Sequence, residues 1–196
     1  MNLTAMTMSP HVGTHADAPV HVRGTMSGAL GEALSPKAPR DRAQIEGDDE
    51  AIGTVALDPF VGPVTVIDLS PHRGAIEIDH VADFLASRAH PPQRVVFKTI
   101  HRIRYHIFEN AYAHLTVELV DKLADIGVKL VGIDAPSVDH VDSKTLAVHH
   151  RLLARKMAWL ENLDLTNSQA RDYFLIALPL KFMQLEASPV RAVLLD

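Results

Sequence analysis

Short β-branched runs alternate with amphipathic segments along this chain, and the alternation constrains its fold more than any other feature. Three runs have the composition of buried strands, at residues 64–69, 94–99 and 128–133. Apolar residues recur with helical spacing between them, over residues 78–88 and 116–126. Strands that alternate with helices predict the α/β class.

The second half of the chain predicts one more helix and then a series of strands. Residues 143–155 have helical spacing, with Asp142 as the expected N-cap. Strands are then expected over residues 158–163, 172–177 and 189–195. These closing strands predict a mixed sheet rather than a purely parallel one.

The whole chain, residues 1–196, is expected to form a single domain, because 196 residues with 47% hydrophobic content can bury a substantial core. Residues 2–9 alternate weakly and predict a further strand. Residues 22–50 are rich in glycine, proline and charge but poor in large apolar side chains. They predict a flexible surface excursion with at most one short helix.

Composition excludes several functional classes. The formal net charge of −5 argues against a nucleic-acid or anionic-membrane surface, and the sequence has no apolar run of about 18 residues that would span a bilayer. The N-terminus lacks the basic start and apolar core of a signal peptide, so we expect a cytoplasmic protein. With 0 cysteines and 12 histidines, a metal site in this chain must use imidazole and carboxylate ligands.

The segment HVGTHADAPVH concentrates groups that bind metals. His11, His15 and Asp17 lie close together in it, and Gly13 allows the backbone to turn between them. Imidazole and carboxylate suit zinc, manganese, iron or nickel, and a carboxylate can bridge two ions. His21 lies four residues beyond Asp17 and is a candidate general acid or base, since its intrinsic pKa is near neutrality. A polar loop with solvated histidines is the alternative, and the spacing alone does not decide between them.

A second pair of candidate ligands, His149 and Glu161, is separated by twelve positions. In one continuous helix they would lie about 18 Å apart, too far to share an ion. They can meet only if the helix ends near Lys156 and the chain doubles back as a strand. Without that reversal, an exposed histidine and a solvated glutamate are the better interpretation.

Three aspartates, Asp134, Asp139 and Asp142, follow the predicted strand at residues 128–133. The carboxyl end of such a strand is a common place for a site in α/β proteins. Turn formation and helix capping explain Asp139 and Asp142 at least as well. Trp159 is assigned to the core. The sequence contains no glycine-rich phosphate loop and no GxSxG nucleophile elbow.

Five blocks of the sequence resemble one known family. HVGTHADAPVH resembles the HxGTHxDxPxH signature of the cyclase-like metal-dependent hydrolases. GIDAPSVDHVDSKT, AVHH, WLENL and IALPLKFMQLEASPVRAVL are similar to the bacterial kynurenine formamidase branch of that family. The resemblance covers residues 7–21 and then residue 55 to the end of the chain. It implies the swivelling β/β/α fold, assembled as a homodimer or homotetramer.

The resemblance also implies a site with two divalent ions, usually zinc. His11 and His15 would hold one ion, Asp17 would bridge both, and His149 would bind the second. Glu161 would complete the cage as a further shared carboxylate. His21 would be the catalytic acid and base. The residues that bind the substrate are not assigned.

The implied activity is that of an arylformamidase, which hydrolyses N-formyl-L-kynurenine to L-kynurenine and formate in tryptophan catabolism. The partner would then be a small-molecule substrate, with no nucleic acid and no membrane. The alternatives are a related cyclic-amide hydrolase of the isatin-hydrolase kind, or a homologue that binds metal but has impaired catalysis. Two departures from the family lead us to expect an altered substrate pocket. Only ten residues precede His11, without the tryptophan that contacts the substrate in the family, and the path from His21 to Gly62 is longer.

Overall fold

The computed structural model describes residues 2–23 and 51–196. These residues form an eight-stranded sheet with the strand order β10-β8-β2-β4-β6-β7-β1-β9. Its strands are β1 (His15–Asp17), β2 (Val61–Asp68), β4 (Arg94–Lys98), β6 (Leu130–Ile133), β7 (Ala158–Glu161), β8 (Asp172–Ile176), β9 (Ala187–Pro189) and β10 (Val193–Leu195). The central strands β2, β4, β6 and β7 are parallel. Both flanks are antiparallel, which confirms the predicted α/β class with a mixed sheet.

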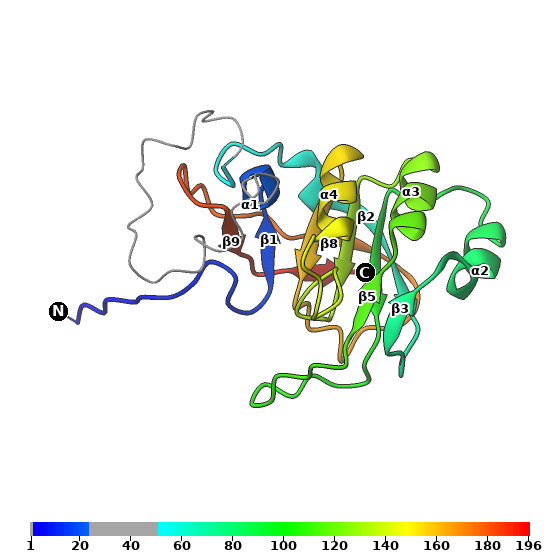
Figure 1. Ribbon diagram of the computed structural model, residues 1–196, viewed down its shortest axis with the longest axis horizontal. Helices are drawn as coiled ribbons and strands as arrows, with labels where there is room; N and C mark the ends of the chain where they lie inside the picture. The colour runs from blue at the N-terminus through cyan, green and yellow to red at the C-terminus, as the bar shows by residue number, and fades with distance from the viewer. Residues whose placement is uncertain (1, 24–50) are drawn as a thin grey trace.

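Helices and a small second sheet complete the described part of the chain. The helices are α1 (Pro19–Arg23), α2 (Ala82–Ala86), α3 (Val117–Asp125), α4 (Ala147–Ala154) and the 3-10 helices η3 (Asp58–Phe60) and η4 (Ile78–His80). The second sheet pairs β3 (Gly74–Ile76) with β5 (Ala113–Leu115) in parallel; neither strand was expected from the sequence. Helices α3 and α4 lie side by side (Figure 1), where Arg151 and Arg155 of the α4 region pair with Asp121 of α3.

Alternation along the central strands builds a hydrophobic core on each face of the large sheet. Val131 and Ile133 of β6 belong to the core that includes α3 and α4, together with Phe97 of β4. Leu130 of β6 and Val96 of β4 belong to the core on the opposite face. The parallel strands are therefore buried on both faces, which explains why their sequences are nearly continuous apolar runs.

The chain reverses directly after α4, as the sequence analysis required. Lys156 adopts a left-handed backbone conformation with φ of 56°, and Met157 donates a backbone hydrogen bond to the Leu152 carbonyl. Strand β7 then runs back along β6. Its last residue, Glu161, pairs in register with His15 of β1, so the reversal brings two distant candidate ligands to one place.

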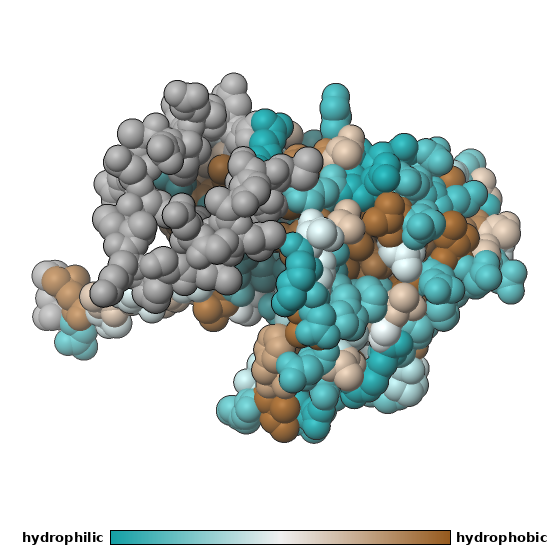
Figure 2. Space-filling view, viewed as in Figure 1, coloured by the Kyte–Doolittle hydropathy of each residue, from teal (hydrophilic) through white to brown (hydrophobic). Residues whose placement is uncertain are grey.

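Several predicted boundaries differ from the structure. The predicted helix over residues 78–88 is divided into η4 and α2. Its start is a capping box in which the His80 ring accepts a hydrogen bond from the Glu77 backbone. None of the residues of α2 is fully buried, and apolar side chains appear at the surface around it (Figure 2). Little burial is therefore available there to stabilise one long helix.

The helix predicted from residue 143 begins only at Ala147, and Asp142 is not its N-cap. Residues 143–146 are irregular with a bend at residues 144–145, and Leu146 lies in the left-handed region at φ of 49°. The last predicted strand, residues 189–195, is divided between β9 and β10. Residues 2–9 are exposed and pair with no strand of the described part of the chain, so the strand predicted there is not formed.

The predicted excursion over residues 22–50 begins too early. Val22 and Arg23 form the end of α1, and Val22 is completely buried. The rest of that segment, residues 24–50, lies outside the described residues. Within the described residues, no helix has both the length and the apolar character needed to cross a membrane.

A buried arginine fixes the entry to β2. The Arg94 guanidinium donates hydrogen bonds to the backbone carbonyls of Asp58, Pro59, Val61 and Pro63. Arg94 is only 1% exposed, so water cannot replace these donors. This side chain therefore joins β4 to the turn of η3 and the start of β2.

We expect Arg94→Leu to lower the free energy of unfolding by about 3 kcal/mol or more, because each buried acceptor left without a donor costs about 1–3 kcal/mol. Chemical denaturation monitored by circular dichroism measures the change. The control is Arg155→Leu, which removes an arginine whose ion pairs lie at the surface and should cost less than about 1 kcal/mol. Equal losses in the two variants would contradict the assigned role of Arg94.

Candidate metal centre

A tight turn and a short buried strand present the first candidate ligands. Val12 donates a backbone hydrogen bond to the Ser9 carbonyl, and Gly13 follows with φ of 69°, in the left-handed region that favours glycine. Strand β1 then lies between β7 and β9. Alternation along β1 directs His15 and Asp17 to one face, while Ala16 joins the core on the other.

Helix α1 places His21 above Asp17. Its Nε2 atom lies 3.8 Å from Asp17 Oδ2, four residues back along the chain. The His21 ring also lies against two other candidate rings, with centroid distances of 4.6 Å to His11 and 5.7 Å to His149. His21 is therefore part of the same cluster of side chains.

The reversal after α4 brings His149 and Glu161 into this cluster. His149 Nε2 lies 3.3 Å from Glu161 Oε1 and 3.6 Å from Asp17 Oδ2. The other Glu161 oxygen, Oε2, lies 3.2 Å from His15 Nε2. All six residues singled out in the sequence thus converge on one place, from the turn before β1, from β1 itself, and from α1, α4 and β7.

Asp17 is common to both groups of side chains that have the spacing of a metal site. One group is His11, Asp17 and His21, and the other is His15, Asp17 and Glu161. An ion held by either group would therefore have Asp17 as a ligand. In this arrangement His15 is grouped with Glu161, and His21 with His11, whereas the family resemblance implies a first ion held by His11 and His15.

Two buried polar atoms support the assignment of this cluster to a metal site. His15 Nε2 and Asp17 Oδ1 are inaccessible to solvent and have no hydrogen-bond partner among the residues that the structure describes. Carboxylate oxygens lie 3.2 and 3.5 Å from His15 Nε2, but not in hydrogen-bonding directions. Buried polar atoms without a partner are costly in a folded protein. A divalent cation would satisfy both atoms, and nitrogen and oxygen donors of this kind suit zinc and other transition metals.

The charges of the cluster are strongly coupled. Burial alone would raise the pKa of Asp17, but the hydrogen bonds and charges of the surrounding histidines hold it well below its usual range. Burial would lower the pKa of His11, yet the carboxylates of Asp17 and Glu186 raise it to about 9. The pKa of His149 is likewise raised despite burial, by Asp139, Asp17 and Glu161. The carboxylates and imidazoles of the cluster therefore stabilise each other's charged forms.

Contacts around the cluster involve residues that the sequence analysis did not assign to it. The Trp159 indole donates a 3.0 Å hydrogen bond to Asp17 Oδ2. The Asp139 carboxylate accepts a 2.6 Å hydrogen bond from His149 Nδ1, and Glu186 Oε1 lies 3.6 Å from His11 Nε2. Trp159 was assigned to the core. Strand alternation places Trp159 on the same face as Glu161, and this pattern in the sequence could have placed Trp159 near the cluster.

Other candidates lie outside the cluster. Asp134 accepts hydrogen bonds from the Thr99 hydroxyl and from the backbone of Thr99 and Ile100, so it joins the end of β6 to the end of β4. Burial raises its pKa. Asp142 is exposed. Asp134 is thus a structural residue that links two strands, whereas Asp142 is not the N-cap of α4 that the sequence predicted.

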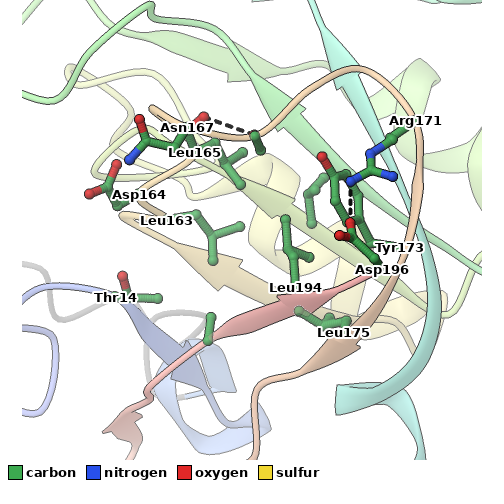
Figure 3. Close-up of a pocket in the computed structure, with 13 residues that line it drawn as sticks. Thr14, Leu163, Asp164, Leu165, Asn167, Arg171, Tyr173, Leu175, Leu194 and Asp196 are labelled. Carbon is green, nitrogen blue, oxygen red and sulfur yellow. Dashed lines mark hydrogen bonds and ion pairs between the residues drawn. The ribbon is translucent and has the colours of Figure 1, made fainter.

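The described residues also enclose a cavity of about 380 Å³ that contains none of the candidate ligands. Leu163, Leu175 and Leu194 form part of its lining, and Arg171 pairs with Asp196 at its edge (Figure 3). Leu163 and Leu175 belong to the core on the sheet face opposite α3 and α4. Trp159, which contacts Asp17, belongs to the other core. The cavity is thus separated from the candidate metal centre by the sheet.

Comparison with known structures gives the same fold. The chain is similar to a predicted metal-dependent hydrolase from Bacillus stearothermophilus, with 26% identity and a TM-score of 0.70 over 96% of this chain and 78% of that one. It is also similar to an isatin hydrolase bound to the product analogue thioisatinate, with 21% identity and a TM-score of 0.72 over 95% of this chain and 72% of that one.

A third similar structure is described as a potential metal-dependent hydrolase with cyclase activity. It shares 23% identity and a TM-score of 0.66, over 96% of this chain and 80% of that one. In addition, the family model named Cyclase matches residues 2–140, a span that includes the HVGTHADAPVH motif. The chain therefore belongs to the cyclase family, and it shares its fold with metal-dependent hydrolases.

Proposed function

We propose that this protein is a metal-dependent arylformamidase that hydrolyses N-formyl-L-kynurenine to L-kynurenine and formate. The observation that carries the proposal is the convergence of the four other candidate ligands and His21 around one buried carboxylate, Asp17, with His15 Nε2 and Asp17 Oδ1 lacking hydrogen-bond partners among the described residues. Its fold relatives include hydrolases, among them isatin hydrolases. The choice of the formamide substrate rests on the sequence blocks that follow residue 128, which are similar to the kynurenine formamidase branch.

In this proposal two divalent ions, with zinc as the expected metal, would be held by His11, His15, Asp17, His149 and Glu161. Asp17 lies between both sets of side chains and would bridge the ions. Bound ions of this kind polarise a carbonyl oxygen and lower the pKa of water, so that it attacks at neutral pH.

His21 would supply the proton that the reaction needs. Hydrolysis forms a bond between the water oxygen and the formyl carbon, and it breaks the bond from that carbon to the aryl nitrogen. The nitrogen leaves readily only if it is protonated. His21 lies beside the ligands and is partly exposed, with 28% of its side-chain surface accessible. Its imidazole is therefore placed to take a proton from water and pass it to the leaving amine.

Isatin hydrolysis is the second candidate, because isatin hydrolases are among the proteins of similar fold. Isatin is a cyclic amide, so its hydrolysis opens a ring and releases no second product. The formamide reaction releases formate. The two activities therefore require substrate pockets of different shape beside the same ligands. Assays with the two substrates distinguish between them.

The first prediction concerns metal content. We expect the purified protein to hold up to two divalent ions per chain. His15→Ala and Asp17→Asn should each reduce that number, since each removes a buried ligand. Elemental analysis of the folded proteins measures the ratio. His106→Ala, at an exposed histidine outside the cluster, is the control and should leave the ratio unchanged. Unchanged metal in both ligand variants would exclude this site.

The second prediction concerns the substrate. The metal-loaded protein should release formate from N-formyl-L-kynurenine, and a chelator should abolish that activity. The same preparation is assayed with isatin, whose ring opening changes its absorbance. Turnover of isatin alone would replace the formamidase assignment with the cyclic-amide one. Bound metal without turnover of either compound would indicate a homologue with impaired catalysis.

The third prediction separates His21 from the ligands. We expect His21→Ala to retain the metal content of the wild type but to lose activity by about 10²–10⁴-fold, the usual scale for a general acid or base. Elemental analysis and kinetics are measured on the same samples. Because His21 has ligand spacing with His11 and Asp17, a parallel loss of one ion would instead identify it as a ligand.

A further inference from the structure

We propose that the dipeptide Val138–Asp139 is a positioning element that sets the orientation of two candidate metal ligands, His149 and Glu161. The inference rests on the proposed metal-dependent function and extends it to residues that contact neither substrate nor metal. One contact is made by the Asp139 carboxylate and the other by the Val138 backbone. Together they determine which atoms of the two ligands face Asp17.

The contact between Asp139 and His149 fixes the tautomer and the orientation of the imidazole ring. Asp139 Oδ2 accepts a hydrogen bond of 2.6 Å from His149 Nδ1, and both side chains are buried. A carboxylate can only accept here, so Nδ1 carries a proton, and Nε2 is the ring nitrogen that would give its lone pair to an ion. Nε2 is the atom that faces Asp17 and Glu161. A histidine ligand held in this way by a carboxylate has a fixed tautomer and a fixed ring orientation.

The same carboxylate also holds the start of α4. It accepts backbone hydrogen bonds from Val148 at 3.1 Å and His149 at 3.0 Å. Leu146, which precedes the helix, offers no side-chain cap. Asp139 therefore binds both the ring and the backbone of His149, so the ligand cannot rotate independently of the helix that carries it.

The preceding residue acts on Glu161. The Val138 backbone N–H donates a 2.8 Å hydrogen bond to Glu161 Oε1. Glu161 Oε2 is left to face His15 Nε2. Consecutive residues of one loop thus fix one ligand from α4 and one from β7.

The small second sheet holds this loop in place. Leu115 of β5 donates a backbone hydrogen bond of 2.9 Å to the Val138 carbonyl, and the Val138 side chain is completely buried. The Ser137 hydroxyl accepts a 3.1 Å hydrogen bond from the Asp139 backbone. The dipeptide is therefore supported from outside the metal centre, as a positioning element requires.

The test compares Asp139→Asn with the wild type and with a matched control. Zinc affinity is measured by competition with a chromogenic chelator, after circular dichroism has shown that each metal-free protein is folded. We expect Asp139→Asn to bind one of its two zinc ions 10- to 100-fold more weakly, the usual effect of removing a carboxylate that supports a histidine ligand. Asp139→Glu, which restores the charge, should recover part of that loss.

The control is Ser143→Ala. The Ser143 hydroxyl accepts a hydrogen bond from the Leu146 backbone and donates a long one of 3.5 Å to Asp139 Oδ1. The His149 ring is held by the other oxygen, Oδ2, so this change weakens the turn before α4 but leaves the contact to the ring in place. We expect a lower melting temperature but wild-type zinc affinity. Equal zinc affinity in Asp139→Asn and the wild type would overturn the proposal, as would an equal loss of affinity in Ser143→Ala.

A second measurement uses only the wild type, so it tests the proposal even if Asp139→Asn does not fold. Nitrogen-15 NMR of the zinc-loaded wild type should show His149 with a protonated Nδ1 and a metal-bound Nε2. The reverse assignment would overturn the proposal. A wild type that binds no zinc would overturn both this inference and the proposed function. Zinc binding without turnover of either substrate would overturn the formamidase assignment alone.

Discussion

The buried carboxylate of Asp17 is the interaction on which the rest of this centre depends. Its side chain has no exposed surface, and a buried charge without partners is costly in a protein interior. The structure surrounds it with His11, His21 and His149 and with the Trp159 indole. These groups lower its pKa despite burial. The carboxylate therefore stays ionised, which a metal ligand must be.

The position of Asp17 is set by the register of β1 rather than by the turn that precedes this strand in the HVGTHADAPVH motif. β1 pairs with β7 so that His15 lies opposite Glu161, and cross-strand neighbours on one face lie within contact distance. A shift of one residue would turn His15 and Asp17 into the core and bring Ala16 to the site. The geometry of the cluster therefore depends on the apolar residues that fix this register, Ala16 and Leu160 on the opposite face of the sheet.

The sequence predicted the parts of this centre that are encoded locally. The strands at residues 64–69, 94–99 and 128–133 were found because they are short β-branched runs, and the helix at residues 116–126 was found because its apolar residues recur with helical spacing. The convergence of His149 with Glu161 followed from a family resemblance, and spacing alone did not favour it. Its physical basis, the left-handed turn at Lys156, has no glycine to mark it in the sequence.

The supporting contacts were harder to predict, because they join residues from distant segments. Asp139 has the composition of a turn former, and only the fold shows that its carboxylate reaches His149 in α4. The β3–β5 sheet was missed because each strand has three residues, too few to show a period. Such short elements are stabilised by their tertiary neighbours, so their own sequence carries little signal.

Burial differs sharply between the two sides of Asp17, and the difference suggests how a substrate would approach. The side chains of His15, His149 and Glu161 are 2%, 3% and 5% exposed. Those of His11 and His21 are 27% and 28% exposed.

A metal site that acts in catalysis must keep one position open, whereas a structural site is closed. The side of His11 and His21 meets this requirement, so a substrate would enter there and meet His21 directly. The closed side, held by Val138 and Asp139, would instead keep the bridging carboxylate and its partners fixed while the open side exchanges substrate and product.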